Sequence, residues 1–318
     1  MRFRPSTSAG CGVSPRPLRV GVQLPEVERE VRWPELRDMA RTAEQVGFDS
    51  LWVGDHLLYR NPGEPVRGPW EAWSTLAGLA AVTERVELGP LVASASFHNP
   101  AMLAKKAATV DEISGGRLIL GLGAGWNEPE YRAFGFPFDH RFERFEEAFT
   151  IIRGLLREGA VDFAGSYHEA RDCVLLPRGP RPQGLPIVLG TAGPRMLRLA
   201  AAHADAWNAW FSWYGNRPEG IAALREKVDA ACAAVGRDPA TLQRTVAVFL
   251  LLGEGEPAGR SGRYEAPPLT GTTEELAAVF RAFAAEGIAH VQVVIDPITV
   301  ESIERFGSVL EALDGGEG

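Results

Sequence analysis

Two adjacent residues, Asp55 and His56, are the best candidates for acid–base chemistry in this sequence. They end an apolar run, residues 48–56, that has the composition of a buried β-strand. Histidine exchanges protons near neutral pH, and an acidic neighbour can orient it or tune its pKa. The alternative is structural: Asp55 caps the following segment and His56 is an ordinary loop residue. Both interpretations stay open on spacing alone.

Three alternating glycines, Gly121, Gly123 and Gly125, precede Trp126, Asn127 and Glu128. A dinucleotide-binding glycine loop follows the first strand of its domain and leads straight into a helix. Here the glycines end the fourth strand, and Pro129 and the loop after it place the next helix at about residue 140. Side chains alternate along a strand, so we expect the glycines to clear one face toward the floor of a cofactor site, with Asn127 as a polar contact.

A turn of small residues, Gly190 to Gly193, comes just before a helix that begins at Pro194. Backbone N–H groups and the helix dipole at such a turn bind phosphate, and Arg195 and Arg198 would add positive charge. The alternative is an ordinary turn between strand and helix. Three tryptophans, Trp207, Trp210 and Trp213, either wall a substrate pocket or pack in the core.

The elements that carry these residues alternate between apolar strands and amphipathic helices. We predict strands at 18–24, 48–56, 86–94, 117–125, 185–193, 205–210, 245–252 and 290–296. A predicted helix follows each of them, at 33–47, 71–83, 100–116, 141–159, 194–204, 218–236, 272–287 and 299–313. Eight such units predict an α/β fold of the (β/α)8 barrel type, with the site at the carboxyl ends of the strands.

Residues 161–184 interrupt this alternation and predict a surface hairpin and proline-rich loop inserted between the fourth helix and the fifth strand. We expect one barrel domain over residues 18–318, preceded by a flexible tail at 1–17. A further polar loop is predicted at 253–268.

Composition excludes several classes of protein. The formal net charge is −8, which argues against nucleic-acid binding and membrane-surface binding, since both need clustered positive charge. Cys11, Cys173 and Cys232 are far apart and form no CxxC pair, and the histidines lack metal-ligand spacing, so we predict neither disulfides nor a metal site. No secretory signal is present in the sequence, and we expect a cytoplasmic location.

Taken together, the motifs resemble one family. The stretches "AEQVGFDSLWVGDHL", "HNPAMLAKKAATVDEISGGRLILGLGAGWNEPEYRAFGFPF" and "LPIVLGTAGPRMLRLAAAHADAWN" are similar to the bacterial luciferase-like flavin and deazaflavin oxidoreductases, especially the branch that depends on coenzyme F420. The resemblance extends from Leu18 to about Leu313. It implies a (β/α)8 barrel with the cofactor across the carboxyl-terminal mouth.

The resemblance also implies roles for individual residues. Asp55 would face the deazaflavin ring and His56 would transfer a proton. A cis peptide bond between Leu91 and Val92 would support the ring from behind, and the cofactor phosphate would lie at the turn 190–193. The cofactor-binding residues implied in this way are Asp55, Leu91, Val92, Ser94, Gly125, Asn127, Gly190, Thr191, Ala192 and Gly193.

The sequence also departs from the family pattern at a few positions. Trp126 stands where several relatives have an acid, which argues against a sugar-phosphate dehydrogenase acid and for a more apolar pocket. Pro90 and Leu91 replace residues that are more often small or polar. Thr191 and Ala192 stand where relatives often have a second glycine or a serine.

We therefore expect a hydride-transfer oxidoreductase that uses coenzyme F420 and a small organic substrate. One alternative is an FMN-dependent monooxygenase that uses O2 and takes reduced flavin from a reductase partner. Another is a non-catalytic flavin- or deazaflavin-binding protein, against which the intact Asp55–His56 pair argues. Proteins of this family are commonly homodimers, so a dimer is the expectation here.

Overall fold

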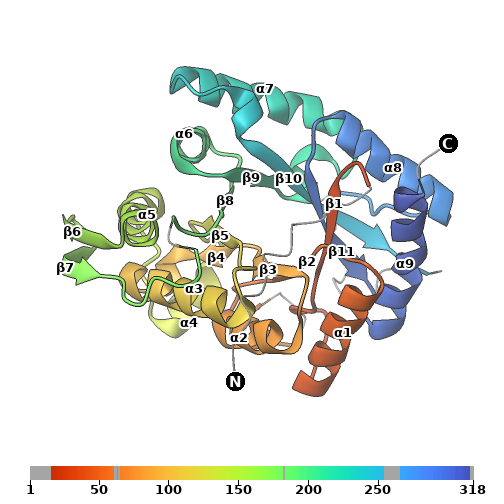
Figure 1. The fold of residues 1–318 in the computed structure, drawn as a ribbon, viewed down its shortest axis with the longest axis horizontal. Coiled ribbons are helices and arrows are strands. Elements are labelled where there is room, and N and C mark those ends of the chain that lie inside the picture. The colour runs from red at the N-terminus through yellow and green to blue at the C-terminus, as the bar shows by residue number, and fades with distance from the viewer. Residues whose placement is uncertain (1–15, 61–62, 64, 182, 254–265, 316–318) are drawn as a thin grey trace, which may run out of the picture.

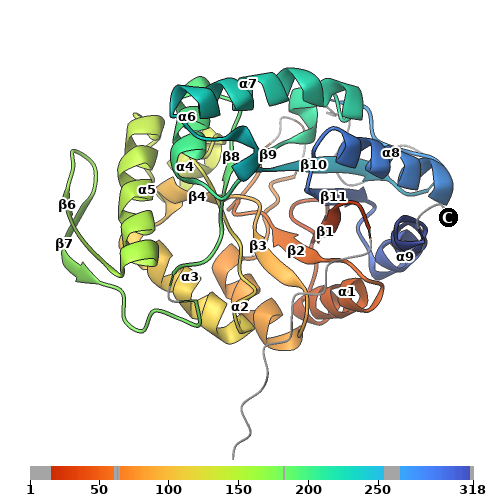
Figure 2. The ribbon, with the colours of Figure 1, turned by 45° about the horizontal axis from the view of Figure 1, so that its top comes forward.

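A ring of parallel strands surrounded by helices makes up the body of the protein (Figures 1 and 2). This computed structural model describes residues 16–60, 63, 65–181, 183–253 and 266–315. The strands of the main sheet are β1 (Arg19–Gln23), β2 (Ser50–Val53), β3 (Glu87–Pro90), β4 (Ala93–Ser94), β5 (Leu120–Gly123), β8 (Ile187–Gly190), β9 (Ala206–Ala209), β10 (Gln243–Leu251) and β11 (His290–Asp296).

The sheet closes on itself. Its strands are hydrogen-bonded in the order β3-β2-β1-β11-β10-β9-β8-β5-β4, and all of these pairs are parallel. A parallel bridge between Leu88 and Leu118 joins β3 to the start of β5, with Ile119 N donating to Leu88 O at 2.8 Å. The predicted (β/α)8 barrel is thereby confirmed.

The helices follow the strands in sequence and cover the outside of the ring. They are α1 (Trp33–Gln45), α2 (Ala72–Val82), α3 (Pro100–Ser114), α4 (Glu128–Phe134), α5 (Arg141–Glu158), α6 (Pro194–His203), α7 (Ile221–Ala234), α8 (Thr273–Ala285) and α9 (Val300–Asp314). Short 3-10 helices lie at η1 (Ala95–Phe97), η2 (Phe211–Tyr214), η3 (Pro218–Gly220) and η4 (Pro239–Thr241). Within the described part of the chain, no helix is long and apolar enough to cross a bilayer.

Local signals in the sequence account for the ends of several helices. Asn99 caps α3 by accepting from Met102 N, and Gly115 ends that helix in the left-handed conformation. Thr272 and Glu275 form a reciprocal capping box at the start of α8. These signals explain why the predicted helices are confirmed to within a few residues.

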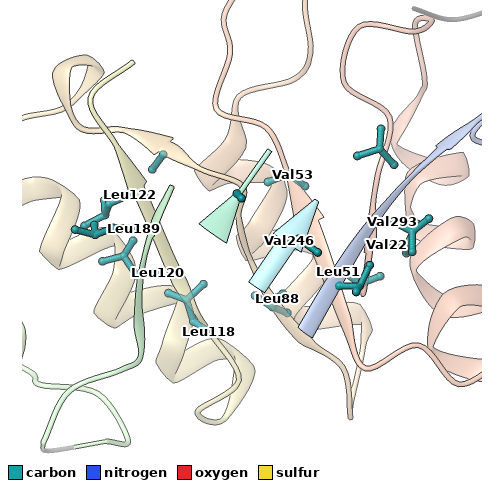
Figure 3. Close-up of a cluster of buried hydrophobic side chains, with 14 of the residues drawn as sticks. Val22, Leu51, Val53, Leu88, Leu118, Leu120, Leu122, Leu189, Val246 and Val293 are labelled. Carbon is teal, nitrogen blue, oxygen red and sulfur yellow. The ribbon is translucent and has the colours of Figure 1, made fainter. Parts of the chain in front are cut away.

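Strand residues alternate between two environments. The outward-facing positions are branched and apolar, among them Val22, Leu51, Leu88, Leu120 and Val293, and all are buried against the helices (Figure 3). The inward-facing positions form a separate small cluster that includes Trp52, Ile119, Val188, Ala206 and Ala247. The main core therefore lies between the barrel and its helices, and only a minor part of it lies inside the ring.

The strand predicted at 86–94 is broken in the middle, where the peptide bond between Leu91 and Val92 is cis, as the family resemblance implied. The glycines of the next strand make room for this break. A Cβ at Gly121 would lie 2.2 Å from Pro90 O, and one at Gly123 would lie 2.8 Å from Val92 Cγ2. Gly121 and Gly123 therefore clear space for the neighbouring segment at Pro90 and Val92, and their place at the floor of a cofactor site stays a prediction.

Gly125 was predicted to share the face of Gly121 and Gly123, but it lies beyond the end of β5. Its φ is +74°, and a Cβ there would lie 1.8 Å from Tyr131 Oη. A left-handed backbone and the approach of a side chain from α4 therefore both favour glycine at this position. Gly125 is a turn residue at the carboxyl end of the strand.

The inserted hairpin is confirmed as β6 (Ala160–Ala164) and β7 (Glu169–Val174), an antiparallel pair that lies outside α5 (Figure 2).

The prediction of a loop up to residue 140 was wrong, because α4 occupies residues 128–134. Arg16 also differs from the predicted tail: it is buried and donates to both carboxylate oxygens of Asp314 at 2.7 and 2.8 Å. Residues 1–15, and most of the loop predicted at 253–268, lie outside the described residues.

Glycine-to-alanine substitutions at Gly121 and Gly193 test this account of packing. Gly121→Ala forces a methyl group against a backbone oxygen that cannot move aside, so we expect a loss of about 2 kcal/mol or more in the free energy of unfolding. Gly193 has φ −77° and no atom within 4 Å of the added Cβ, so Gly193→Ala should be neutral or slightly stabilising. Denaturant unfolding measures both, and equal losses would contradict the explanation.

Candidate active site

His56 lies just beyond the carboxyl end of β2 and is held between two buried carboxylates. Its Nδ1 is 2.8 Å from Glu130 Oε1, and its Nε2 is 3.7 Å from Glu26 Oε1. The two acids are 1% and 6% exposed, whereas the imidazole side chain is 20% exposed and accessible from the mouth of the barrel. A histidine in this position can exchange a proton with a molecule bound at the mouth.

Helix α4 provides one of these carboxylates. Glu130 lies in its first turn, and its Oε2 accepts a hydrogen bond from Leu57 N at 2.8 Å. Asn127, which precedes the helix, donates from Nδ2 to Leu58 O at 3.0 Å. Together these bonds fix the backbone on the carboxyl-terminal side of His56, so that the orientation of the imidazole does not depend on a free loop.

The other carboxylate comes from the loop after β1. Glu26 Oε2 accepts from Gln23 Nε2 at 2.8 Å, and Glu26 Oε1 accepts from Tyr59 Oη at 3.1 Å. The carboxyl group packs against Gly54, where an added Cβ would lie 2.5 Å from Glu26 Cδ. The Glu26 carboxylate can therefore lie beside His56 only because residue 54, directly before the Asp55–His56 pair, is a glycine.

The surroundings of His56 favour its charged form. Burial on its own would lower the pKa of this imidazole, but the negative charges of Glu26 and Glu130, with the hydrogen bond to Glu130, outweigh burial and raise the pKa above its usual value. The raised pKa makes protonated His56 the resting form over a wider pH range, as is required of a proton donor.

Aromatic rings border the imidazole on its open side. The ring centroid of Tyr59 lies 4.7 Å from that of His56, and the centroid of Trp126 lies 5.5 Å away in an edge-on arrangement. Trp126 is 63% exposed, so it stands at the rim of the barrel mouth. A cavity of about 280 Å³ adjoins this group and is lined by Glu26, Val66 and Trp70, among other residues.

Asp55 turns away from His56. Its Oδ2 accepts hydrogen bonds from Ser94 N at 2.9 Å and from His98 Nε2 at 2.8 Å. The expectation that Asp55 orients the histidine is corrected accordingly, since Glu130 does so. Asp55 instead anchors the chain just after the cis bond, and its proposed contact with a cofactor ring stays a prediction.

Several of the predicted cofactor-binding residues are neighbours in space. Ser94 Oγ is 3.1 Å from Tyr131 Oη, which itself donates to Ala124 O at 2.9 Å next to Gly125. A Cβ at Gly190 would lie 3.1 Å from Val92 Cγ1, so β8 meets the same bulge from the other side. One continuous rim is thus formed by six of the predicted residues: Asp55, Leu91, Val92, Ser94, Gly125 and Gly190.

The predicted phosphate turn leads directly into α6. Pro194 is the first helical residue and Gly193 precedes it; no side chain caps the helix. Thr191 Oγ1 accepts from Gly193 N at 3.3 Å, and Ala192 is half-buried. The Arg195 side chain is engaged elsewhere than at residues 190–193. Its Nη1 donates to Glu143 Oε1 at 2.9 Å, and its guanidinium lies over the Phe142 ring.

The other predicted residues divide between core and surface. Trp207 is buried and donates to Thr191 O at 2.7 Å, so it holds the backbone of the predicted phosphate turn. Trp213 is 42% exposed, and Glu128 pairs on the surface with Arg132 at 3.0 Å. Among the described residues, no three His, Cys, Asp or Glu side chains form a group that would hold a metal ion.

Reasoning from the sequence missed Glu26 and Glu130, the two acids nearest to the catalytic candidate. The helix that carries Glu130 had a signal: Pro129 suits a first helical turn, and Gly135 ends the helix in the left-handed conformation. Glu26 lies in an irregular loop between β1 and α1, and no spacing rule relates it to His56.

Known proteins resemble this chain in both sequence and fold. It is 33% identical over 210 residues to 5,10-methylenetetrahydromethanopterin reductase of Archaeoglobus fulgidus, covering 65% of this chain and 57% of that protein. It is 34% identical over 173 residues to pyrimidine monooxygenase RutA of Cronobacter sakazakii, covering 53% of this chain and 50% of that protein. The chain thus spans little more than half the length of these relatives.

A solved structure of an F420-dependent secondary alcohol dehydrogenase in complex with an F420-acetone adduct superimposes with a TM-score of 0.77 at 20% identity, covering 93% of this chain and 99% of that one. At this identity the likeness concerns the fold alone. Residues 18–290 match the family described as luciferase-like monooxygenase. With its closed parallel barrel and the cis bond at the end of β3, the chain belongs to the luciferase-like monooxygenase family.

Proposed function

We propose that this protein is an F420-dependent oxidoreductase that exchanges a hydride between the deazaflavin and a small organic substrate, with His56 as the proton donor. The observation that carries the proposal is the position of His56 at the barrel mouth between two buried carboxylates. F420-dependent enzymes are among the relatives in sequence and in fold.

The residues at the mouth fit such a cofactor. The N-terminus of α6 has no side-chain cap, and the space next to Gly193 is open. Thr191 N donates to Asn208 O and Gly193 N to Thr191 Oγ1, so the N–H of Ala192 and those of the first turn of α6 are the ones offered to a phosphate. The rim made by Leu91, Val92 and Ser94 lies between this turn and His56 and would support a flat ring. When bound, the deazaflavin supplies a hydride donor or acceptor.

Within this site the protein acts mainly by positioning and proton transfer. Glu130 holds Nδ1 of His56, which leaves Nε2 as the nitrogen that exchanges a proton. When a substrate carbonyl carbon receives a hydride, its oxygen takes the Nε2 proton; in the reverse direction the hydroxyl proton returns to Nε2. The negative charges of Glu26 and Glu130 stabilise the imidazolium between turnovers.

A second candidate function is an FMN-dependent monooxygenase that uses O2 and reduced flavin from a reductase partner. Pyrimidine monooxygenases are about as similar to this chain as an F420-dependent glucose-6-phosphate dehydrogenase, and the proposed phosphate turn suits either cofactor. The imidazolium at the mouth favours the deazaflavin proposal, because hydride exchange with a carbonyl needs a proton donor at that place.

Binding of the two cofactors to purified protein decides between these functions. On the leading proposal we expect fluorescence titration to show saturable binding of F420 and much weaker binding of FMN. Tight binding of FMN with no binding of F420 would overturn the leading proposal and favour the monooxygenase.

The His56→Ala variant tests proton transfer. With a substrate found from a panel, turnover should fall at least tenfold, since general acid catalysis contributes roughly 10²–10⁴-fold, while F420 affinity stays near that of the unchanged protein. If turnover is unchanged, His56 has no part in the mechanism.

The pKa of His56, measured by NMR titration of its imidazole in the cofactor-free protein, tests the two carboxylates. We expect a value above the usual figure of about 6.5, falling in both Glu26→Gln and Glu130→Gln because each removes a negative charge beside the ring. Glu128→Gln on the same helix is the control, and its pKa should match that of the unchanged protein. Equal shifts in all three variants would contradict the geometry.

A further inference from the structure

The opposite end of the barrel holds a second cavity, of about 490 Å³. Its lining includes the first residues of β1, β3, β9, β10 and β11, so it opens at the amino-terminal mouth, away from His56. This volume is within the range of small-molecule sites, which is roughly 300–1,000 Å³. Part of its wall is apolar, formed by Ile119, Val188 and Ala206.

Two buried side chains of β11, His290 and Gln292, line this cavity. His290 is 1% exposed, and its Nε2 is 2.8 Å from Ser50 Oγ, which accepts from Trp52 Nε1 at 2.7 Å. Ser50 Oγ can accept from Trp52 and still donate its own proton to Nε2, and in that arrangement His290 carries its proton on Nδ1. Nδ1 is then a donor on the cavity wall, and the described residues hold no acceptor for it.

Gln292 stands two residues farther along β11 and shares the inward face with His290. Its Oε1 accepts from Asn208 Nδ2 at 2.7 Å, which leaves the amide Nε2 as a donor with no acceptor among the described residues. Both side chains line the cavity. Two uncharged donors side by side in a buried wall are complementary to a carboxylate or a similar acceptor group.

Positive charge surrounds the entrance. Four arginines line the cavity, Arg19, Arg157, Arg181 and Arg237, against two carboxylates, Glu87 and Asp205. Arg19 pairs with Glu87 at 2.5 Å and Arg157 with Asp205 at 2.5 Å.

Of the two remaining guanidiniums, only that of Arg237 gives the entrance a positive excess. Arg181 pairs with Asp111 outside the lining, whereas Arg237 has no carboxylate partner in the described part of the chain and donates to carbonyl oxygens at the end of α6. A positive entrance is notable in a chain of net charge −8 and attracts anions.

From these contacts we infer that the amino-terminal mouth of the barrel is a binding site for a small organic anion, with its carboxylate against His290 and Gln292 and its apolar body against Ile119, Val188 and Ala206. Arg19 stands beside His290, because the two residues are opposite each other in the register of β1 and β11. Its guanidinium would supply positive charge for the bound carboxylate. The site is independent of the proposed oxidoreductase function, because the two mouths share none of these residues.

A direct binding measurement tests the site with 4-fluorobenzoate as the probe, followed by ¹⁹F NMR on the full chain. We expect saturable binding with a Kd on the order of 1 mM or tighter. The uncharged analogue 4-fluorobenzamide should bind at least tenfold more weakly. Absence of saturable binding would overturn the proposal, and equal binding of the amide would overturn the anionic class.

Paired variants locate the bound probe. Ala206→Leu fills the amino-terminal cavity and should abolish binding, whereas Ala192→Leu, the same change at the carboxyl-terminal mouth, should leave it intact. The reverse pattern would place the probe at the cofactor mouth and contradict the inference.

The half-exposed Arg19 gives a second test that does not depend on the core, so it decides the matter if Ala206→Leu fails to fold. Arg19→Gln should weaken binding about tenfold, and Arg171→Gln, the same charge change on the exposed hairpin, should not. Equal affinities in these two variants would contradict a role for Arg19.

Discussion

The close approach of the chain at Val92 to strands β5 and β8 is the constraint on which the rest of the site depends. Val92 lies in space that a side chain would need at the positions of Gly121, Gly123 and Gly190. Because glycine stands at these three inward positions, the broken strand can enter the barrel and bring Ser94 to the carboxylate of Asp55. The glycines act through the neighbouring backbone, and a ring on the rim would rest on that backbone.

Further contacts link this rim to helix α4. Gly125 ends β5 in a left-handed turn that accommodates Tyr131, and Tyr131 belongs to the same short helix as Glu130. The turn therefore places Glu130 so that its buried carboxylate contacts Nδ1 of His56. Tyr131 and Glu130 are adjacent in sequence, so one helix connects the bulge after β3 to the imidazole after β2. Glu130 holds the histidine, which the sequence analysis expected of Asp55, whereas Asp55 holds the bulge after β3.

Much of the fold follows from local patterns in the sequence, whereas the finer parts of the site do not. Apolar alternation, helix caps and glycine stops predict the barrel, its helices and the inserted hairpin, because each depends on residues close together in the chain. The pairing of His56 with Glu26 joins residues 30 positions apart across two loops, and no periodicity encodes it. Helix α4 was missed because a helix of seven residues gives too short a window for its spacing to be evident.

The barrel interior separates the two mouths chemically. Asn208 donates to both Thr245 and Gln292, and Thr245 donates to Trp207 O, so this part of the interior is filled by side chains whose polar groups bond to one another. Trp52, Ile119 and Ala247 fill the remainder as an apolar cluster. Charged groups gather at the strand ends: carboxylates around His56 at one mouth, and at the other four guanidiniums against the carboxylates of Glu87 and Asp205. Burial makes a charge costly unless it is paired, so a filled, neutral interior lets opposite polarities persist at the two ends of one barrel.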